Sequence, residues 1–153
     1  MAKRENKPTS YSPTPAIWRL RETATAAYTT GARQEHITAL KAGLSMQAFD
    51  LLAADMGLSA QDLAAVLHIA PRTLARRKKE GRLQPTESER LYRLGTLFEK
   101  AILVLGDAGA ARVWFNTPAP ALDGAAPLHF ADTEPGAREV EDLLGRLEHG
   151  VFT

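Results

Sequence analysis

Two short helical segments joined by a tight turn constrain the fold of this chain more than any other feature of its sequence. In SAQDLAAVLHIAPRTLARRKKEGRL, Ser59 and Asp62 have the spacing of a capping box at a helix start. Pro71 occupies a position that proline favours at the start of a helix, and Gly81 would end that helix. Four small or apolar residues lie where such a pair buries its core: Ala64, Leu67, Ile69 and Leu74. The pattern predicts a helix-turn-helix unit.

The turn of this unit has two unusual residues. His68 stands where Gly is usual, and Ala70 stands where Ser or Thr would be a stronger cap. A His residue adopts the left-handed backbone conformation at moderate cost, so the turn can still form.

A second set of signals predicts a helix before this unit. Ser45 precedes MQAFDLLAADMG, in which Phe49, Leu52 and Met56 follow a helical period. Gly57 is the expected stop of that helix.

A longer helix is expected after the unit. Thr86 with Glu89 has the spacing of another capping box, and Gly106 would end the helix. Its apolar stripe is broad: Leu91, Leu94, Phe98, Ala101, Ile102 and Leu105. We expect part of this stripe to contact a second copy of the chain in a dimer; the alternative is that the internal core covers it entirely. A short helix over residues 108–115 should follow.

The stretch RVWFNTPAPALDGAAPLHFADTEPG, from Arg112 to Gly136, interrupts the helical pattern. Its prolines, Pro118, Pro120 and Pro127, stiffen the chain and lower the entropy that docking would cost. A last helix begins near Thr133 and has one apolar face: Val140, Leu143, Leu144 and Leu147. Because no segment of useful length alternates as a strand does, the predicted fold class is all-α.

The composition narrows the class of protein. The 153 residues have room for one domain or two small ones, and the hydrophobic share of 44% is ordinary for a globular protein. Residues 1–15 are polar and basic, without the apolar core of a signal peptide, and we expect a flexible arm there. No apolar run approaches a membrane span, and the absence of cysteine is compatible with the cytoplasmic location that we expect.

The charge is divided along the chain. Residues 1–85 carry 13 Lys and Arg against 7 Asp and Glu, whereas residues 107–153 carry 3 against 8. This division indicates two different partners, one of them polyanionic; the alternative is that the charges only keep the surface soluble. The residues expected to contact DNA lie on or beside the second helix of the unit: Arg72, Thr73, Arg76, Arg77, Lys78, Lys79 and Arg82. A compact helical scaffold with a solvated basic face is the alternative.

No pattern in the chain points to catalysis. His36, His68, His129 and His149 are scattered, and no pair lies four residues apart on one helix as metal ligands would. No Gly-rich phosphate loop follows a strand, and nothing places Ser, His and Asp together. We therefore expect no enzyme activity, no metal and no cofactor.

Two stretches carry a resemblance to a known family. GLSMQAFDLLAADMGLSAQDLAAVLHIAPRTLARRKKEGRLQPTESERLYRL and ARVWFNTPAPALDGAAPLHFADTEPGAREVEDLLGRLEHGVF resemble the Xre/MbcA/ParS antitoxins, the partners of RES-domain toxins in type II toxin–antitoxin modules. The resemblance implies a helix-turn-helix domain over residues 16–106 and a toxin-binding domain over residues 107–153, after the arm of residues 1–15. Phe115 stands where the family commonly has Leu, and Asp123 stands where Gly is commoner.

The same resemblance implies a function. Toxins of the family are implied to destroy NAD, and the antitoxin, not itself an enzyme, to cover the entrance to their active site. It also implies that antitoxin chains pair, which would place two basic helices on a palindromic operator. The residues expected at the toxin are Trp114, Phe115, Asn116, Leu122, Glu139, Glu141, Asp142, Gly150, Val151, Phe152 and Thr153. Aromatic anchors often dominate an interface, but packing in the domain's own core is the alternative for Trp114.

Two functions remain open at this point. One is an antitoxin that inhibits a protein toxin and represses its own operon by binding operator DNA. The other is a DNA-binding transcriptional regulator whose C-terminal domain serves dimerisation or ligand binding. The acidic, Trp-containing end of the chain favours the antitoxin, and a RES-type toxin gene beside this reading frame would decide between them.

Overall fold

The computed structural model describes residues 37–150, and over that range it confirms the all-α fold. Its elements are α3 (Met46–Met56), α4 (Ala60–Val66), α5 (Pro71–Glu80), α6 (Pro85–Leu105), α7 (Ala108–Asn116), the short 3-10 helix η2 (Pro120–Leu122), α8 (Pro127–Phe130) and α9 (Glu134–Glu148). Residues 37–42 are helical as well. The predicted arm over residues 1–15 and the expected toxin contacts Val151, Phe152 and Thr153 lie outside the described residues.

Most of the expected helix starts and stops are confirmed. The Ser59 side chain accepts a hydrogen bond from the Asp62 amide at the start of α4, and Ser45 caps α3 through the Ala48 amide. Thr133 caps α9 in the same way. The predicted glycine stops end three helices in the left-handed conformation: Gly57, Gly81 and Gly106.

The turn between α4 and α5 forms as expected. His68 has a φ of 57°, so it adopts the left-handed conformation that Gly usually supplies. Ala70 is the N-cap of α5 and makes no side-chain capping bond, while Pro71 takes the first helical position. The helix-turn-helix unit predicted from the sequence is confirmed.

The start of α6 differs from the prediction. The capping box is formed by Gln84 and Glu87, two residues before the Thr86–Glu89 pair that we expected. Pro85 explains the difference, because its fixed φ suits the first position of a helix and allows α6 to begin there.

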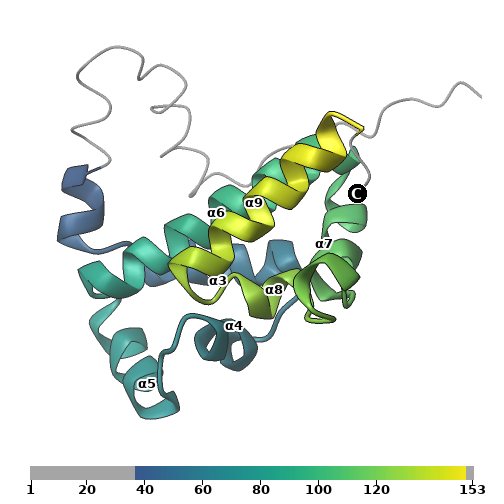
Figure 1. The fold of residues 1–153 in the computed structure, drawn as a ribbon. Helices are drawn as coiled ribbons and strands as arrows, with labels where there is room; N and C mark the ends of the chain where they lie inside the picture. The colour runs from purple at the N-terminus through teal and green to yellow at the C-terminus, as the bar shows by residue number, and fades with distance from the viewer. Residues whose placement is uncertain (1–36, 151–153) are drawn as a thin grey trace, which may run out of the picture.

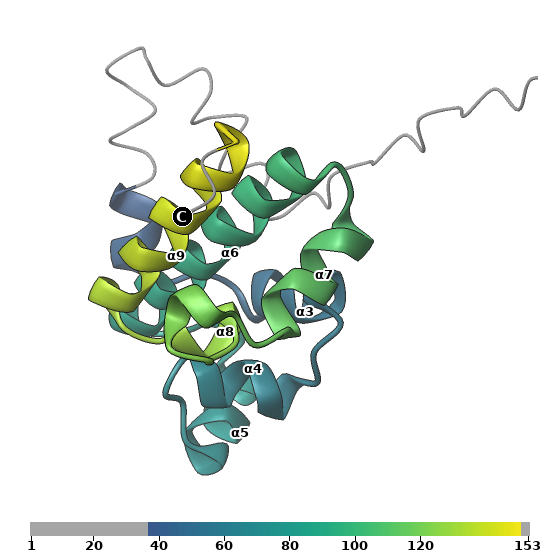
Figure 2. The same ribbon diagram turned by 45° about the vertical axis from the view of Figure 1, so that its right-hand side comes forward.

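The helix-turn-helix unit occupies one end of the molecule, and α6 connects it to the rest (Figure 1). Helices α7 and α9 both pack against α6, and α8 contacts α7 and α9. Figure 2 shows α4 and α5 at the bottom and the C-terminal end of α9 at the top, as does Figure 1. One continuous cluster of buried apolar side chains connects the helix-turn-helix unit with the C-terminal helices. It extends from Leu44, just before α3, to Leu144 in α9.

The apolar stripe of α6 is covered within the chain. Leu91, Leu94, Phe98 and Ile102 are buried, and Leu105 is half-buried. Since α7 and α9 pack on α6, the stripe is not available to a second copy. The expectation that this stripe forms a dimer contact is therefore wrong, and a dimer would need another surface.

The irregular stretch before α9 is mostly core. Phe115 and Leu122 are buried with exposed fractions of 0% and 1%, and Trp114 is half-buried with its ring edge-on to Phe115 at 5.2 Å. Asp123 ends η2 in the left-handed conformation, with a φ of 55°. An Asp residue tolerates that conformation better than most, which explains how it replaces the commoner Gly.

Candidate functional site

The second helix of the unit, α5, presents cations on its outer side. Arg72, Arg76 and Lys79 are exposed and lie opposite the buried Leu74; we call these three side chains the basic face of α5. Lys78 is exposed as well, but it lies about 100° around the helix from Lys79, on the flank nearer to Leu74. Thr73, another expected DNA contact, is half-buried in the first turn of α5.

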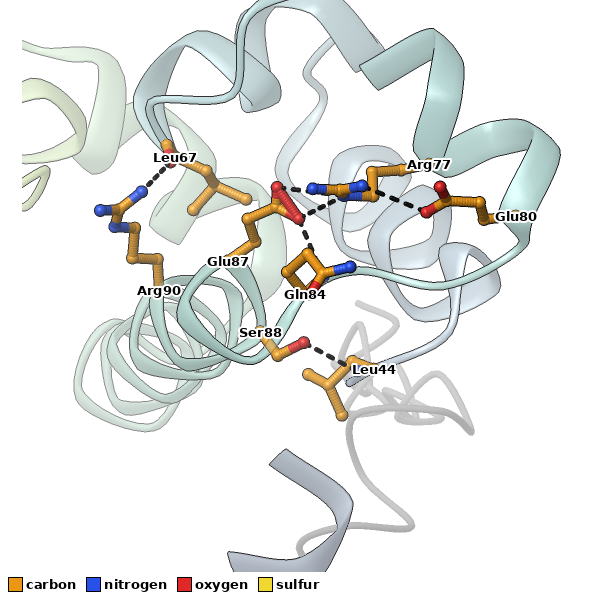
Figure 3. A network of polar contacts seen from close by, with 8 residues as sticks. All are labelled: Leu44, Leu67, Arg77, Glu80, Gln84, Glu87, Ser88 and Arg90. Atoms are coloured by element: carbon orange, nitrogen blue, oxygen red, sulfur yellow. Dashed lines mark hydrogen bonds and ion pairs between the residues drawn. The ribbon is translucent and has the colours of Figure 1, made fainter. Parts of the chain in front are cut away.

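Arg77 does not belong to that group. Only 8% of its surface is exposed, and its Nε donates to Glu87 Oε1 at 2.7 Å and to Glu87 Oε2 at 3.3 Å. Its Nη1 also donates to Glu80 Oε2 at 3.1 Å, as Figure 3 shows. The hydrogen bond to Glu87 raises the pKa of Arg77, and the charged guanidinium points toward α6. The expectation that Arg77 contacts DNA is wrong, because Glu87 holds its side chain inward.

Arg82 lies just beyond the end of α5. It is exposed, but its Nη1 donates to the carbonyl oxygen of Ala42 at 3.2 Å. The backbone is tight at this point: Gly43 has a φ of +89°, and a Cβ there would lie 2.1 Å from the Leu83 carbonyl oxygen. The connection from α5 to α6 is thereby fixed against the segment that leads into α3.

The acidic residues expected to contact a toxin lie exposed on α9. Glu139, Glu141 and Asp142 are all exposed, but Glu139 and Glu141 lie on opposite flanks, because two successive steps turn an α-helix by about 200°. Glu141 lies 3.7 Å from the Lys100 amino group of α6. They form two edges of α9 rather than one acidic face.

The other expected toxin contacts divide into exposed and buried residues. Asn116 is exposed and donates through Nδ2 to the Arg112 carbonyl at 2.8 Å, and Gly150 is exposed with a φ of 68°. Phe115 and Leu122 lie in the core, and the expectation that they contact a partner is wrong because α6 and α9 cover them. Trp114 keeps part of its ring at the surface.

Two exposed apolar residues were not among the contacts predicted from the sequence. Leu103 on α6 and Val113 on α7 are each 68% exposed, which is unusual for large apolar side chains in a packed module. The spacing of α6 contained the signal for Leu103: a residue adjacent to Ile102 points about 100° away from the stripe. Both residues lie within the C-terminal part of the chain.

Polar contacts also join the two parts of the molecule. His68, in the turn of the helix-turn-helix unit, lies 3.4 Å from Asp132, just before α9. Arg112 of α7 donates through Nε to the carbonyl oxygen of Asp55 in α3 at 2.5 Å. Each part therefore contacts the other through side chains as well as through the shared core.

Neither a metal centre nor a membrane span is found within residues 37–150. No three His, Asp or Glu side chains lie together there as metal ligands would. Over the same range, every helix is too short or too polar to cross a bilayer.

The geometry defines a class of protein: a helix-turn-helix module with an exposed basic face, joined by one long helix to a second helical module. Two family models match the chain accordingly. The antitoxin Xre-like helix-turn-helix domain matches residues 35–95, and the antitoxin Xre/MbcA/ParS C-terminal toxin-binding domain matches residues 100–150.

Curated relatives agree with both models. The chain is 37% identical over 119 residues to the antitoxin Xre of Yersinia enterocolitica, an alignment that covers 76% of this chain and 80% of the relative. It is 33% identical over 94 residues to the antitoxin Xre of Photorhabdus laumondii, covering 60% of this chain and 64% of the relative. The antitoxin Xre of Pseudomonas putida is 32% identical over 80 residues, covering 52% of this chain and 50% of that protein. This chain belongs to the Xre family of antitoxins.

Membership of this family confirms the resemblance inferred from the sequence. The two matching models confirm a helix-turn-helix domain followed by a C-terminal toxin-binding domain. All three of these relatives carry the name of an antitoxin rather than that of an enzyme. The domain boundary that we expect between residues 106 and 107 lies at the end of α6 and stays a prediction.

Proposed function

We propose that this chain neutralises a RES-domain toxin that degrades NAD, and that it does so by covering the entrance to the toxin's active site. The match of residues 100–150 to a toxin-binding domain is the observation that carries this proposal. The resemblance of the sequence to antitoxins of RES-domain toxins supports the identity of the partner. In this proposal the chain is the inhibitor and catalyses nothing itself.

The toxin contact is proposed for the exposed side chains of the C-terminal part. Leu103 and Val113 would supply apolar area, and Trp114 an aromatic edge, which are contacts that desolvate well in an interface. Around them, the exposed carboxylates of α9, such as Glu139 and Asp142, would form a polar rim. Gly150 leads into Val151, Phe152 and Thr153, which remain proposed contacts.

The basic face of α5 is proposed to bind operator DNA and to repress the operon. Arg72, Arg76 and Lys79 have the long donors and the positive charge that phosphates and base edges require. In both Figure 1 and Figure 2, α5 lies at the end of the molecule away from the C-terminal end of α9. DNA and toxin would therefore not compete for one surface.

We also propose that two chains pair on a two-fold operator. The contact must use a face other than the buried stripe of α6. Light scattering at micromolar concentration, alone and with DNA, tests this: a monomer mass in both would contradict the pairing. Because operon DNA and NAD are both cytoplasmic, we propose the cytoplasm as the place of action.

The test of the toxin proposal uses the protein encoded beside this reading frame. That protein should consume NAD when purified, and an equal amount of this chain should stop the consumption. The double variant Leu103→Glu/Val113→Glu should lose inhibition while its helical content stays unchanged, because both side chains are exposed. The variant Arg72→Ala/Arg76→Ala is the control and should inhibit fully. A neighbouring protein that leaves NAD intact would contradict the RES assignment.

A further inference from the structure

We propose that Glu87 is the positioning residue of the DNA-binding helix: through Arg77 it sets the orientation of α5, and with it the discrimination between operator and other DNA. This inference rests on the proposed binding of DNA by the basic face of α5. Glu87 itself lies in α6 and is only 8% exposed, so it does not touch DNA.

A single carboxylate connects two helices here. Glu87 Oε1 accepts from Arg77 Nε of α5 at 2.7 Å and from the Gln84 amide, at the start of α6, at 2.8 Å. Glu87 Oε2 accepts from the same Nε at 3.3 Å (Figure 3). The position of the Arg77 side chain is therefore defined relative to the first turn of α6.

The first two turns of α6 also contact the other helices of the unit. Ser88 Oγ accepts a hydrogen bond from the Leu44 amide at 2.8 Å, just before α3. Arg90 Nη1 donates to the carbonyl oxygen of Leu67, at the end of α4, at 3.1 Å. The close-up in Figure 3 shows these contacts around the N-terminal end of α6. The first two turns of α6 thus contact the segment before α3, the end of α4 and the buried side of α5.

Few side chains of α5 are buried, so the contact with Glu87 is one of the few that fix the orientation of the helix. Among its residues only Leu74 and Arg77 are buried, and its main packing partner is α4. Its N-cap, Ala70, makes no capping bond. Without Glu87, the apolar contact of Leu74 and the hydrogen bond from the Met46 amide to the Gly81 carbonyl oxygen would remain, but the side-chain bond from α5 to α6 that fixes how the helix is turned about its axis would be lost.

Orientation affects the two parts of DNA recognition differently. Attraction between cations and phosphates acts over a Debye length and tolerates small shifts of the helix. Hydrogen bonds to base edges require donors within a few tenths of an ångström, so Arg72 and Arg76 must be placed accurately. The short charge-assisted bond from Arg77 Nε to Glu87, together with the bond from Nη1 to Glu80, fixes the plane of the guanidinium and supplies that accuracy.

The inference is tested with the full chain and two duplexes of equal length, one from upstream of its own reading frame and one of scrambled sequence. In Glu87→Gln we expect the ratio of the two affinities to fall about tenfold, as for the loss of a good base contact. Affinity for the scrambled duplex and the slope of log K against log salt should change little, because the basic face keeps its charges.

Two further variants separate positioning from charge and from folding. Glu89→Gln removes the same charge from an exposed position two residues along α6, and it should leave the affinity ratio unchanged. Arg77→Lys keeps the charge but has no Nε–H at the position that bonds Glu87, so it should lower the ratio as Glu87→Gln does. In the wild type, the Arg77 Nε–H should give a resolved NMR signal protected from exchange, and Glu87→Gln should abolish that protection.

The outcomes are distinct. If Glu87→Gln and Arg77→Lys both match Glu89→Gln in the affinity ratio, the positioning role is overturned, while DNA binding by α5 stands. If both variants lose helical content and bind the two duplexes equally poorly, the pair is only structural and the inference also fails. If the wild type itself does not distinguish the two duplexes, the proposed DNA recognition fails, and this inference with it.

Discussion

Helices α5 and α9 are both amphipathic and both present a charged outer side, but different forces hold them. The buried positions of α9 are Gly136, Ala137, Val140 and Leu144, a continuous face packed on α6. The buried positions of α5 are Leu74 and Arg77, one apolar side chain and one charged one. Apolar packing stabilises but is not directional, whereas an ion pair defines an orientation at little net gain in stability. We infer that α9 is held for stability and α5 for orientation.

The largest expected effect is in α9. Leu144→Ala should destabilise the protein by about 3 kcal/mol, because the fully buried side chain leaves a cavity beside α6. Chemical denaturation followed by circular dichroism measures this. Leu103→Ala is the matched control: its side chain is 68% exposed, so the change should stay within about 0.5 kcal/mol. Equal losses in the two variants would contradict the packing described for α9.

A second prediction concerns how closely α9 approaches the preceding segment. A Cβ at Gly136 would lie 1.8 Å from the carbonyl oxygen of Phe130, so Gly136→Ala should destabilise by about 2–3 kcal/mol. At Gly145, in the same helix, a Cβ meets nothing within 4 Å. Gly145→Ala should therefore stabilise by up to about 1 kcal/mol through helix propensity. Thermal melts of the two variants should move in opposite directions, and a shared direction would refute the close approach.

In α5 we expect two neighbouring arginines to behave differently. Arg77→Ala should cost about 2 kcal/mol of unfolding free energy, because it leaves the Glu87 carboxylate buried without its partner. Arg76→Ala should change stability by less than about 0.5 kcal/mol, because its side chain is exposed. Urea unfolding of both variants measures the contrast. A stable Arg77→Ala protein would mean that the buried pair contributes nothing to the fold.

The smallest effect is expected in the salt dependence of DNA binding. Arg76→Ala should reduce the slope of log K against log salt by about 1, the amount for one lost phosphate contact. Lys79→Ala should do the same, since both side chains are exposed on the basic face. Fluorescence anisotropy at several salt concentrations measures the slopes. Unchanged slopes in both variants would make the basic face a solvated surface.

Much of the fold could be predicted from the sequence because its signals are local. A capping side chain and the amide that it bonds are three residues apart, so Ser59 and Thr133 identified the starts of α4 and α9. A glycine stop depends only on its own φ, which made Gly57, Gly81 and Gly106 reliable. Even the start of α6 differed by only two residues, where Pro85 competed with the expected pair.

The candidate site was less predictable because the direction of a side chain depends on distant partners. Arg76 and Arg77 are adjacent and chemically identical, and the sequence determined only that this helix is basic. The tertiary structure decided that Arg77 faces inward, because α6 brings Glu87 to within 2.7 Å of it. In the same way, the sequence determined that α6 has a broad apolar stripe, and only the packing of α7 and α9 decided what covers it. Local signals act within one turn of helix, whereas the partner of a face is chosen when segments far apart in the chain pack together.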